Sequence, residues 1–282
     1  MNGFRTELIN KIVGFNAHIT IKPYENKINI KDIVQKLNSI SKNLILSNSG
    51  EAIIMNDNSS KGIILRGYTS QDFPKLEIIK NKNFIGDRNN MTHNHISIGK
   101  ELSFILDVKI GDKITIISTS GVQTIIGSLP KQKTFIIKSF FESGLVDFDN
   151  NIIFVNLNTL EEFSNLSKSD RNLEIYLKSP QKIENQKIIV QKIFSNDLVV
   201  TWADMNRSLF SALKVERNVM FIILTLIIIV AAFNIISGLT ILIKNKTKEI
   251  AILKTLGLNN TSIKKSFFLT GFTIGFFATI SG

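Results

Sequence analysis

His93 and His95 form the one local pair of residues in this sequence that could bind a metal. They stand two positions apart in M-T-H-N-H-I-S-I-G, and alternate residues of a strand can point two imidazoles at one ion. No third ligand is recognisable beside them, and the 282-residue chain has no cysteine. We therefore interpret the segment as a polar loop before a strand, and we predict no metal site.

Other catalytic motifs are missing from the sequence. It has no G-x-S-x-G, H-E-x-x-H, Walker A or dinucleotide-binding glycine pattern, and its scattered carboxylates form no identifiable catalytic pair. We predict no catalytic residue, no cofactor bound by this chain and no enzymatic activity.

The charge of the chain is basic, with 34 Lys and Arg against 23 Asp and Glu. Such an excess can indicate an anionic partner. Here it is spread thinly up to residue 218 and becomes dense only after residue 243, where a membrane topology explains it better. Nucleic acid is therefore not a predicted partner.

Residues 219–243 form a continuous run without a charged side chain. As a helix this run would extend about 38 Å, which exceeds the roughly 30 Å of bilayer hydrocarbon. A second apolar run covers residues 266–282. We predict that both are transmembrane helices, the second one continuing beyond Gly282.

Lysines mark the orientation of these helices. The connector at 244–265 is richer in them than the segment before the first helix, and the positive-inside rule places it in the cytoplasm. The preceding residues 1–218 are then outside. Because no signal peptide follows Met1, we expect a further transmembrane helix before residue 1.

Helical and strand-like patterns are interleaved in the part that precedes the first span. Helical spacing is seen at 5–13, 33–40, 102–106 and 158–166, and alternation at 18–21 and 173–177. Short Ile-rich runs at 51–56 and 62–66, and the segment 113–118, are also read as strands. We predict an α+β extracytoplasmic domain attached to transmembrane α-helices.

The expected divisions follow from these patterns. They are the end of a preceding transmembrane helix with its periplasmic extension at 1–16, a periplasmic α+β domain at 17–200, a connecting helix at 201–218, a transmembrane helix at 219–243, a cytoplasmic coupling segment at 244–265 and the start of the next transmembrane helix at 266–282.

Two further segments stand out. Residues 119–133, T-S-G-V-Q-T-I-I-G-S-L-P-K-Q-K, are expected to form a hairpin loop. Residues 248–257, K-E-I-A-I-L-K-T-L-G, are expected to form a short amphipathic helix that stops at Gly257. From the residues alone, this helix could either press against a cytoplasmic partner or lie on the membrane surface.

Six segments resemble the LolC/LolE family of lipoprotein-releasing ABC transporter permeases. They are M-N-G-F-R-T-E-L at 1–8, I-S-I-G-K-E-L at 96–102 with I-G-D-K-I at 110–114, S-L-F-S-A-L-K-V-E-R-N-V-M at 208–220, A-A-F-N-I-I-S-G-L at 231–239 and K-E-I-A-I-L-K-T-L-G at 248–257. The last of these is shared with the wider MacB/FtsX-like superfamily.

The resemblance implies a multi-pass protein of the bacterial inner membrane with a periplasmic domain. It implies a second permease subunit, identical or different, and a cytoplasmic LolD-like ATPase that binds ATP and Mg²⁺. It also implies a lipoprotein substrate, contact with membrane lipids and a periplasmic LolA-like carrier. The paralogue remains open.

The resemblance also implies three sets of site residues. The expected ATPase-coupling residues are Lys248, Glu249, Ile250, Leu253, Lys254 and Gly257. A carrier-binding hook would use Gly127, Leu129, Pro130 and Lys131, and the lipoprotein cavity would be lined by Met1, Phe4 and Met220.

Two alternative functions remain at this point. One is a related permease that exports peptides or transmits ATPase state to a cell-wall hydrolase. The other is a membrane-anchored periplasmic scaffold without an ATPase.

Overall fold

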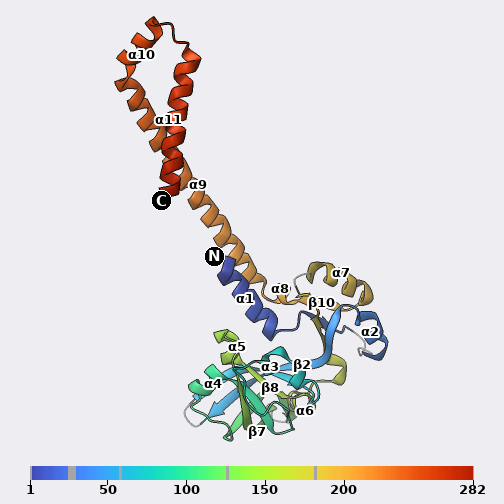
Figure 1. Cartoon of the computed structure of the whole chain (residues 1–282). Coiled ribbons are helices and arrows are strands. Elements are labelled where there is room, and N and C mark those ends of the chain that lie inside the picture. Colours follow the sequence, from blue (N-terminus) through green and yellow to red (C-terminus); the bar gives the residue numbers. More distant parts are fainter. Residues whose placement is uncertain are drawn as a thin grey trace. The chain divides into compact units, whose positions relative to one another are not determined.

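A computed structural model describes residues 2–24, 30–56, 59–89, 91–124, 127–180 and 183–281. The chain divides into two compact units, Met1–Ser208 and Leu209–Gly282. Each unit is described by itself (Figure 1).

The first unit contains a six-stranded barrel. Its strands pair in the order β2-β3-β8-β5-β7-β6, and β6 pairs back to β2, which closes the ring. The pairs β3–β8 and β5–β7 are parallel and the other pairs are antiparallel. The strands are β2 (Ser41–Asn56), β3 (Ser59–Tyr68), β5 (His95–Gly99), β6 (Lys113–Thr124), β7 (Gly127–Phe141) and β8 (Ile152–Asn156).

Alternating apolar side chains fill the barrel. Positions two apart on each strand point inward, as in Ile63 and Leu65 of β3 or Ile96 and Ile98 of β5, and all four are buried. Helices α4 (Lys100–Ile105) and α6 (Leu157–Ser164) add Leu102, Leu160 and Phe163 to the same core. This packing makes the barrel the rigid body of the unit.

Strand β2 also belongs to a second sheet. Its first half pairs with β9 (Asn172–Leu177), which pairs with β1 (Ile19–Lys22), which in turn pairs with β10 (Leu198–Thr201). All three pairings are antiparallel. One strand therefore links the barrel to the four-stranded sheet.

Three further helices of the first unit are α1 (Asn2–Phe15), α2 (Ile30–Leu37) and α7 (Ile183–Ile193). Its remaining elements are short. They are α3 (Glu77–Lys80), β4 (Ile85–Gly86), α5 (Val146–Asn151), α8 (Trp202–Met205) and the 3-10 turns Phe73–Lys75 and Lys168–Asp170. The architecture is α+β, as predicted.

Three local predictions are wrong. Residues 201–218 are not one helix, because Thr201 and Asp204 form a capping box that starts α8, and Asn206 ends it. The spacing of Asn158 and Glu161 in the sequence predicts a capping box, but helix α6 is capped by Asn156, whose side chain accepts from the backbone N–H groups of Asn158 and Thr159. Residues 119–124 and 127–133 lie in strands β6 and β7 and not in a loop.

The second unit is a helical hairpin. Helix α9 (Arg207–Asn245) and helix α11 (Asn260–Ser281) flank the short helix α10 (Thr247–Thr255), as Figure 1 shows. Both long helices are apolar enough to cross a membrane, with mean hydropathies of 3.0 and 1.2 in their most apolar windows. Gly271 of α11 faces Leu239 of α9, and a small residue allows such an approach.

Candidate functional site: a capped helix between two apolar helices

Helix α10 ends in a full Schellman motif. The backbone N–H of Leu258 donates to the carbonyl of Leu253 at 3.1 Å, and the N–H of Gly257 donates to that of Lys254 at 3.0 Å. Gly257 has φ = +89°, a conformation that a side chain strains. The predicted stop of this helix is therefore confirmed, and its geometry is fixed locally.

The apolar side chains of α10 and its C-terminal turn are exposed. Leu253 is 40% exposed, whereas Ile252 and Leu256 are 60% and 74% exposed, although these two were not among the predicted contact residues. Exposed apolar side chains clustered on one short element are typical of a protein or membrane contact. The helical spacing of the sequence places Leu256 on the same apolar face as Leu253, but only the structure shows that its side chain is exposed.

The charged residues of α10 stand beside this apolar surface. Glu249 pairs with Lys246 through both carboxylate oxygens, at 2.7 and 2.8 Å from the ammonium nitrogen, while Lys248 and Lys254 are exposed and Ile250 is half-buried. These residues share one short helix. Their contact with an ATPase stays a prediction.

The predicted carrier hook is a long β-hairpin. Gly127 is the first residue of β7, and Leu129 and Pro130 on the same strand are exposed. Lys131 is half-buried, and its ammonium donates to the backbone carbonyl of Glu162 at 2.8 Å and to the side-chain oxygen of Asn165. Lys131 thus has partners within the chain, and its contact with a carrier stays a prediction.

The predicted lipoprotein cavity is described only in part. Met1 lies outside the described residues, and Phe4 belongs to α1. Met220 lies on α9, where its side chain is 44% exposed. Helix α1 is in the first unit and Met220 in the second, so a joint site stays a prediction.

Each histidine of the pair has its own partner. Nδ1 of His93 lies 3.0 Å from the Thr159 hydroxyl, and Nδ1 of His95 lies 2.8 Å from that of Thr92. Within the described part of the chain, no group of three or more His, Asp or Glu side chains could hold a metal ion.

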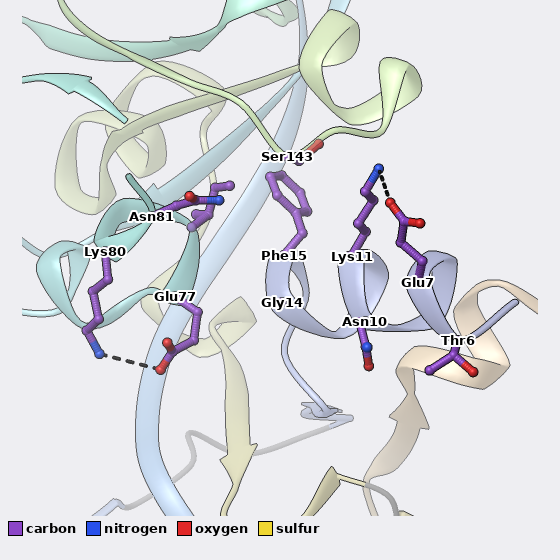
Figure 2. A pocket seen from close by; sticks show the side chains of 11 residues that line it. Thr6, Glu7, Asn10, Lys11, Gly14, Phe15, Glu77, Lys80, Asn81 and Ser143 are labelled. Atoms are coloured by element: carbon purple, nitrogen blue, oxygen red, sulfur yellow. Dashed lines mark hydrogen bonds and ion pairs between the residues drawn. The ribbon is translucent and has the colours of Figure 1, made fainter. Parts of the chain in front are cut away.

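A groove of about 820 Å³ separates α1 from α3. Figure 2 shows Glu7 and Lys11 on α1, Glu77 and Lys80 on α3, and the Phe15 ring between the two helices. The lining residues are Thr6, Glu7, Asn10, Lys11, Gly14, Phe15, Glu77, Ile78, Lys80, Asn81 and Ser143.

The charges of this groove are paired within each wall. Lys11 lies 3.3 Å from Glu7, and Lys80 lies 3.5 Å from Glu77. A hydrogen bond from Lys42 at 2.8 Å, which is the largest cause, lowers the pKa of Glu77. The groove is thus a charge-balanced surface.

A buried carboxylate network surrounds Glu174, and sequence reasoning missed it. Glu174 accepts hydrogen bonds from the hydroxyls of Ser47 at 2.6 Å, Tyr68 at 3.1 Å and Tyr176 at 2.9 Å. Burial, followed by the Glu174 charge, raises the pKa of both tyrosines well above its usual value. The network joins strands β2, β3 and β9 and has a structural role.

Comparison with known proteins agrees with the resemblance. Residues 221–282 match the FtsX-like permease C-terminal family. The whole chain is 29% identical to the lipoprotein-releasing system transmembrane protein LolC of Neisseria meningitidis serogroup B, over 70% of that protein. It is 26% identical to LolE of Haemophilus influenzae, with 98% of this chain and 68% of that protein covered. The predicted resemblance to LolC/LolE-type permeases is confirmed.

Among solved structures, the periplasmic region of MacB from Actinobacillus actinomycetemcomitans matches with a TM-score of 0.41 and 9% identity. That match covers 72% of this chain and 97% of the MacB region. The extracellular domain of the transporter YknZ from Gram-positive bacteria matches with a TM-score of 0.39 and 14% identity, over 64% of this chain and all of that domain.

Proposed function

We propose that this chain is a non-catalytic permease subunit of an ABC transporter that releases lipoproteins from the bacterial inner membrane and passes them to a periplasmic carrier. The observation that carries the proposal is α10, a rigidly capped helix with exposed apolar side chains between two helices that could each span a membrane. The similarity to LolC over the whole chain supports a lipoprotein as the transported substrate.

The proposed division of labour is the one that the resemblance to LolC/LolE permeases implies. A separate cytoplasmic ATPase would bind ATP and Mg²⁺, and α10 would transmit its movement to α9 and α11. A second permease subunit would complete the membrane cavity. The domain formed by Met1–Ser208 would stand in the periplasm and meet the carrier.

Aspartate substitutions in α10 test the coupling. Leu253→Asp and Leu256→Asp place a charge on the apolar contact surface, and burying an unpaired charge is costly, so we expect at least about a tenfold loss of ATPase copurifying with the permease. Ile188→Asp on α7, which is 56% exposed in the wild type, is the matched control and should copurify normally. Normal copurification of both α10 variants would contradict the coupling role.

Reconstitution tests the cargo. The permease and its ATPase, in liposomes containing a triacylated lipoprotein, should release it to a soluble carrier when ATP is added. Export of a peptide instead would favour the related-permease alternative. Absence of any ATPase partner would favour the scaffold.

A further inference from the structure

The hairpin of β6 and β7 bends where it leaves the barrel. Ile117 pairs with Gln132, but the next paired residues are Gly121 and Pro130. Three residues of β6, 118–120, therefore oppose the single residue Lys131 of β7. Such a bulge bends a strand and directs the residues that follow it, so the bend sets the direction of residues 121–124 and 127–130.

The β6 side of the bend is held by local hydrogen bonds. The Thr119 hydroxyl donates to the carbonyl of Glu51 at 2.9 Å, and the backbone N–H of Ser120 donates to the Ser118 hydroxyl at 3.1 Å. Ser118 is buried. These hydrogen bonds attach residues 118–120 to the barrel. They do not involve the residues of the hairpin that follow the bend.

Helix α6 holds the other side. The Lys131 ammonium donates to the carbonyl of Glu162, in the last turn of α6, and to the Asn165 side-chain oxygen. The Asn165 side-chain nitrogen donates to the carbonyl of Gly121 at 3.3 Å. Asn165 therefore contacts both strands, and the lysine charge is favourable at the negative end of the helix.

The C-terminal end of α6 is held in place by core packing and by an ion pair. Leu160 and Phe163 are buried in the barrel core, and Glu161 forms a bidentate ion pair with Arg171 at 2.6 and 2.7 Å. Asn165 itself adopts the left-handed conformation, with φ = 54°, that ends the helix. The clamp of Lys131 and Asn165 is thus tied to the core of the domain.

We propose that Lys131 and Asn165 are positioning residues that fix the direction of the hairpin, which carries the exposed Leu129 and Pro130. The assignment of these two residues to a carrier-binding hook follows from the resemblance and rests on the proposed function. The clamp of Lys131 and Asn165 does not rest on it.

Hydrogen exchange of the full chain in lipid nanodiscs, without a carrier, tests the clamp. Lys131→Met removes the ammonium and keeps the apolar stem. Asn165→Gly removes the amide, and glycine tolerates the left-handed conformation. Since the clamp is solvent-accessible, we expect an unchanged unfolding midpoint but about five- to thirty-fold faster exchange in peptides covering 119–133, the range that a loss of one or two kcal/mol produces.

Matched variants sharpen this test. Lys133→Met removes a lysine of the same strand, whose ammonium lies over the Phe135 ring at 5.5 Å, and should leave exchange in 119–133 unchanged. Lys131→Arg keeps a donor and should restore much of the protection. The double variant Lys131→Met/Asn165→Gly should exchange little faster than either single variant, because both residues belong to one clamp.

Carrier binding separates the two proposals. The clamp variants should weaken binding of a purified carrier about as much as they loosen the hairpin, while Leu129→Ala should weaken binding without faster exchange. Wild-type exchange rates in both clamp variants would overturn the inference whatever the carrier does. Wild-type protein that binds no carrier would overturn only the carrier assignment and the proposed function.

Discussion

Gly99 lies where strand β5 passes against the backbone of helix α5. A Cβ atom at this position would lie 2.0 Å from the carbonyl oxygen of Asp149. The Asp149 carboxylate is buried and accepts from the backbone N–H of Ser143 at 2.8 Å and of Gly144 at 3.1 Å. The α5 backbone is therefore held in place, and the glycine of I-S-I-G-K-E-L has a steric reason.

Gly99→Ala should lower the free energy of unfolding by about 1–3 kcal/mol, the usual range for overpacking a core. Thermal unfolding of the purified chain measures this. Gly62→Ala on β3, where nothing lies within 4 Å of the added methyl, is the control and should stay within about 0.5 kcal/mol of the wild type. Equal midpoints for both variants would remove the steric explanation.

His18 makes stability depend on pH. Burial lowers its pKa below the ordinary value of 6.5, and its Nδ1 accepts the backbone N–H of Leu177 at 2.8 Å. Below the ordinary pKa, His18 binds a proton in the unfolded chain but stays neutral in the folded chain. The contribution of His18 to the free energy of unfolding is therefore complete above the ordinary pKa, and it is lost as pH falls toward the folded-state pKa.

We expect the free energy of unfolding to fall as pH drops below about 6.5, the ordinary pKa of histidine, with at most about 1.4 kcal/mol per pH unit from this single proton. His18→Gln keeps an acceptor for Leu177 but cannot titrate, so its profile should be flatter over that range. Chemical denaturation at several pH values gives both profiles. Parallel profiles would assign the slope to other groups.

Residues that act through neighbours in the chain were predictable, and those that act across the fold were not. Gly257 follows a helical pattern, so the end of α10 could be read from the sequence. Glu174 contacts Ser47 and Tyr68, which are 127 and 106 positions away, and no local pattern reports such a contact. Lys131 was assigned to a carrier by resemblance, whereas its partners on α6 required coordinates.

At the scale of elements, α1 is joined to the first unit by an aromatic anchor. Phe15, in its last turn, is buried and stacks on Phe148 with ring centroids 4.6 Å apart, while the Arg66 guanidinium lies 5.3 Å above its ring. Strand β1, which follows α1, pairs with β10, which precedes α8. Helix α1 and helix α8 are therefore joined to two neighbouring strands of the sheet, β1 and β10.

Phe15→Ala should therefore loosen α1 as well as destabilise the domain. Loss of a buried phenylalanine costs about 3–5 kcal/mol, and we expect faster hydrogen exchange in the last turn of α1 and a lower unfolding midpoint. Asn10→Ala, on the exposed side of the same helix, should change neither. Equal behaviour of the two variants would mean that α1 is held by something other than the aromatic anchor.

Elements could be predicted where one periodicity governs them. The predicted strands at 51–56 and 62–66 lie within β2 and β3, because a barrel interior demands alternation. Closure of the barrel could not be predicted. The first half of β2 pairs with β9 and its second half pairs with β6, and the alternating pattern of one strand does not show which strands it pairs with. The hairpin was taken for a loop because its glycines and proline suggest turns, whereas in the structure Gly121 pairs with Pro130 and Gly127 pairs with Thr124 within the two strands.

For the whole molecule, the decisive property is which side of the membrane each unit faces. Two apolar helices flank a connector that carries most of the local lysines, and the positive-inside rule predicts that this connector lies in the cytoplasm. The basic residues of this connector and its flanks are Lys244, Lys246, Lys248, Lys254, Lys264 and Lys265. The proposed coupling of α10 to an ATPase requires this orientation, and the proposed meeting with a carrier requires the opposite side for the barrel.

Single cysteines can determine the orientation, because the chain contains no cysteine of its own. Ser60→Cys lies on the exposed surface of β3, and Asn259→Cys lies between α10 and α11. In cells with a permeabilised outer membrane, a membrane-impermeant maleimide should label position 60 and leave position 259 unlabelled. After lysis both should react, which controls for thiol accessibility. Labelling of position 259 before lysis would place α10 in the periplasm, where it could meet no cytoplasmic ATPase.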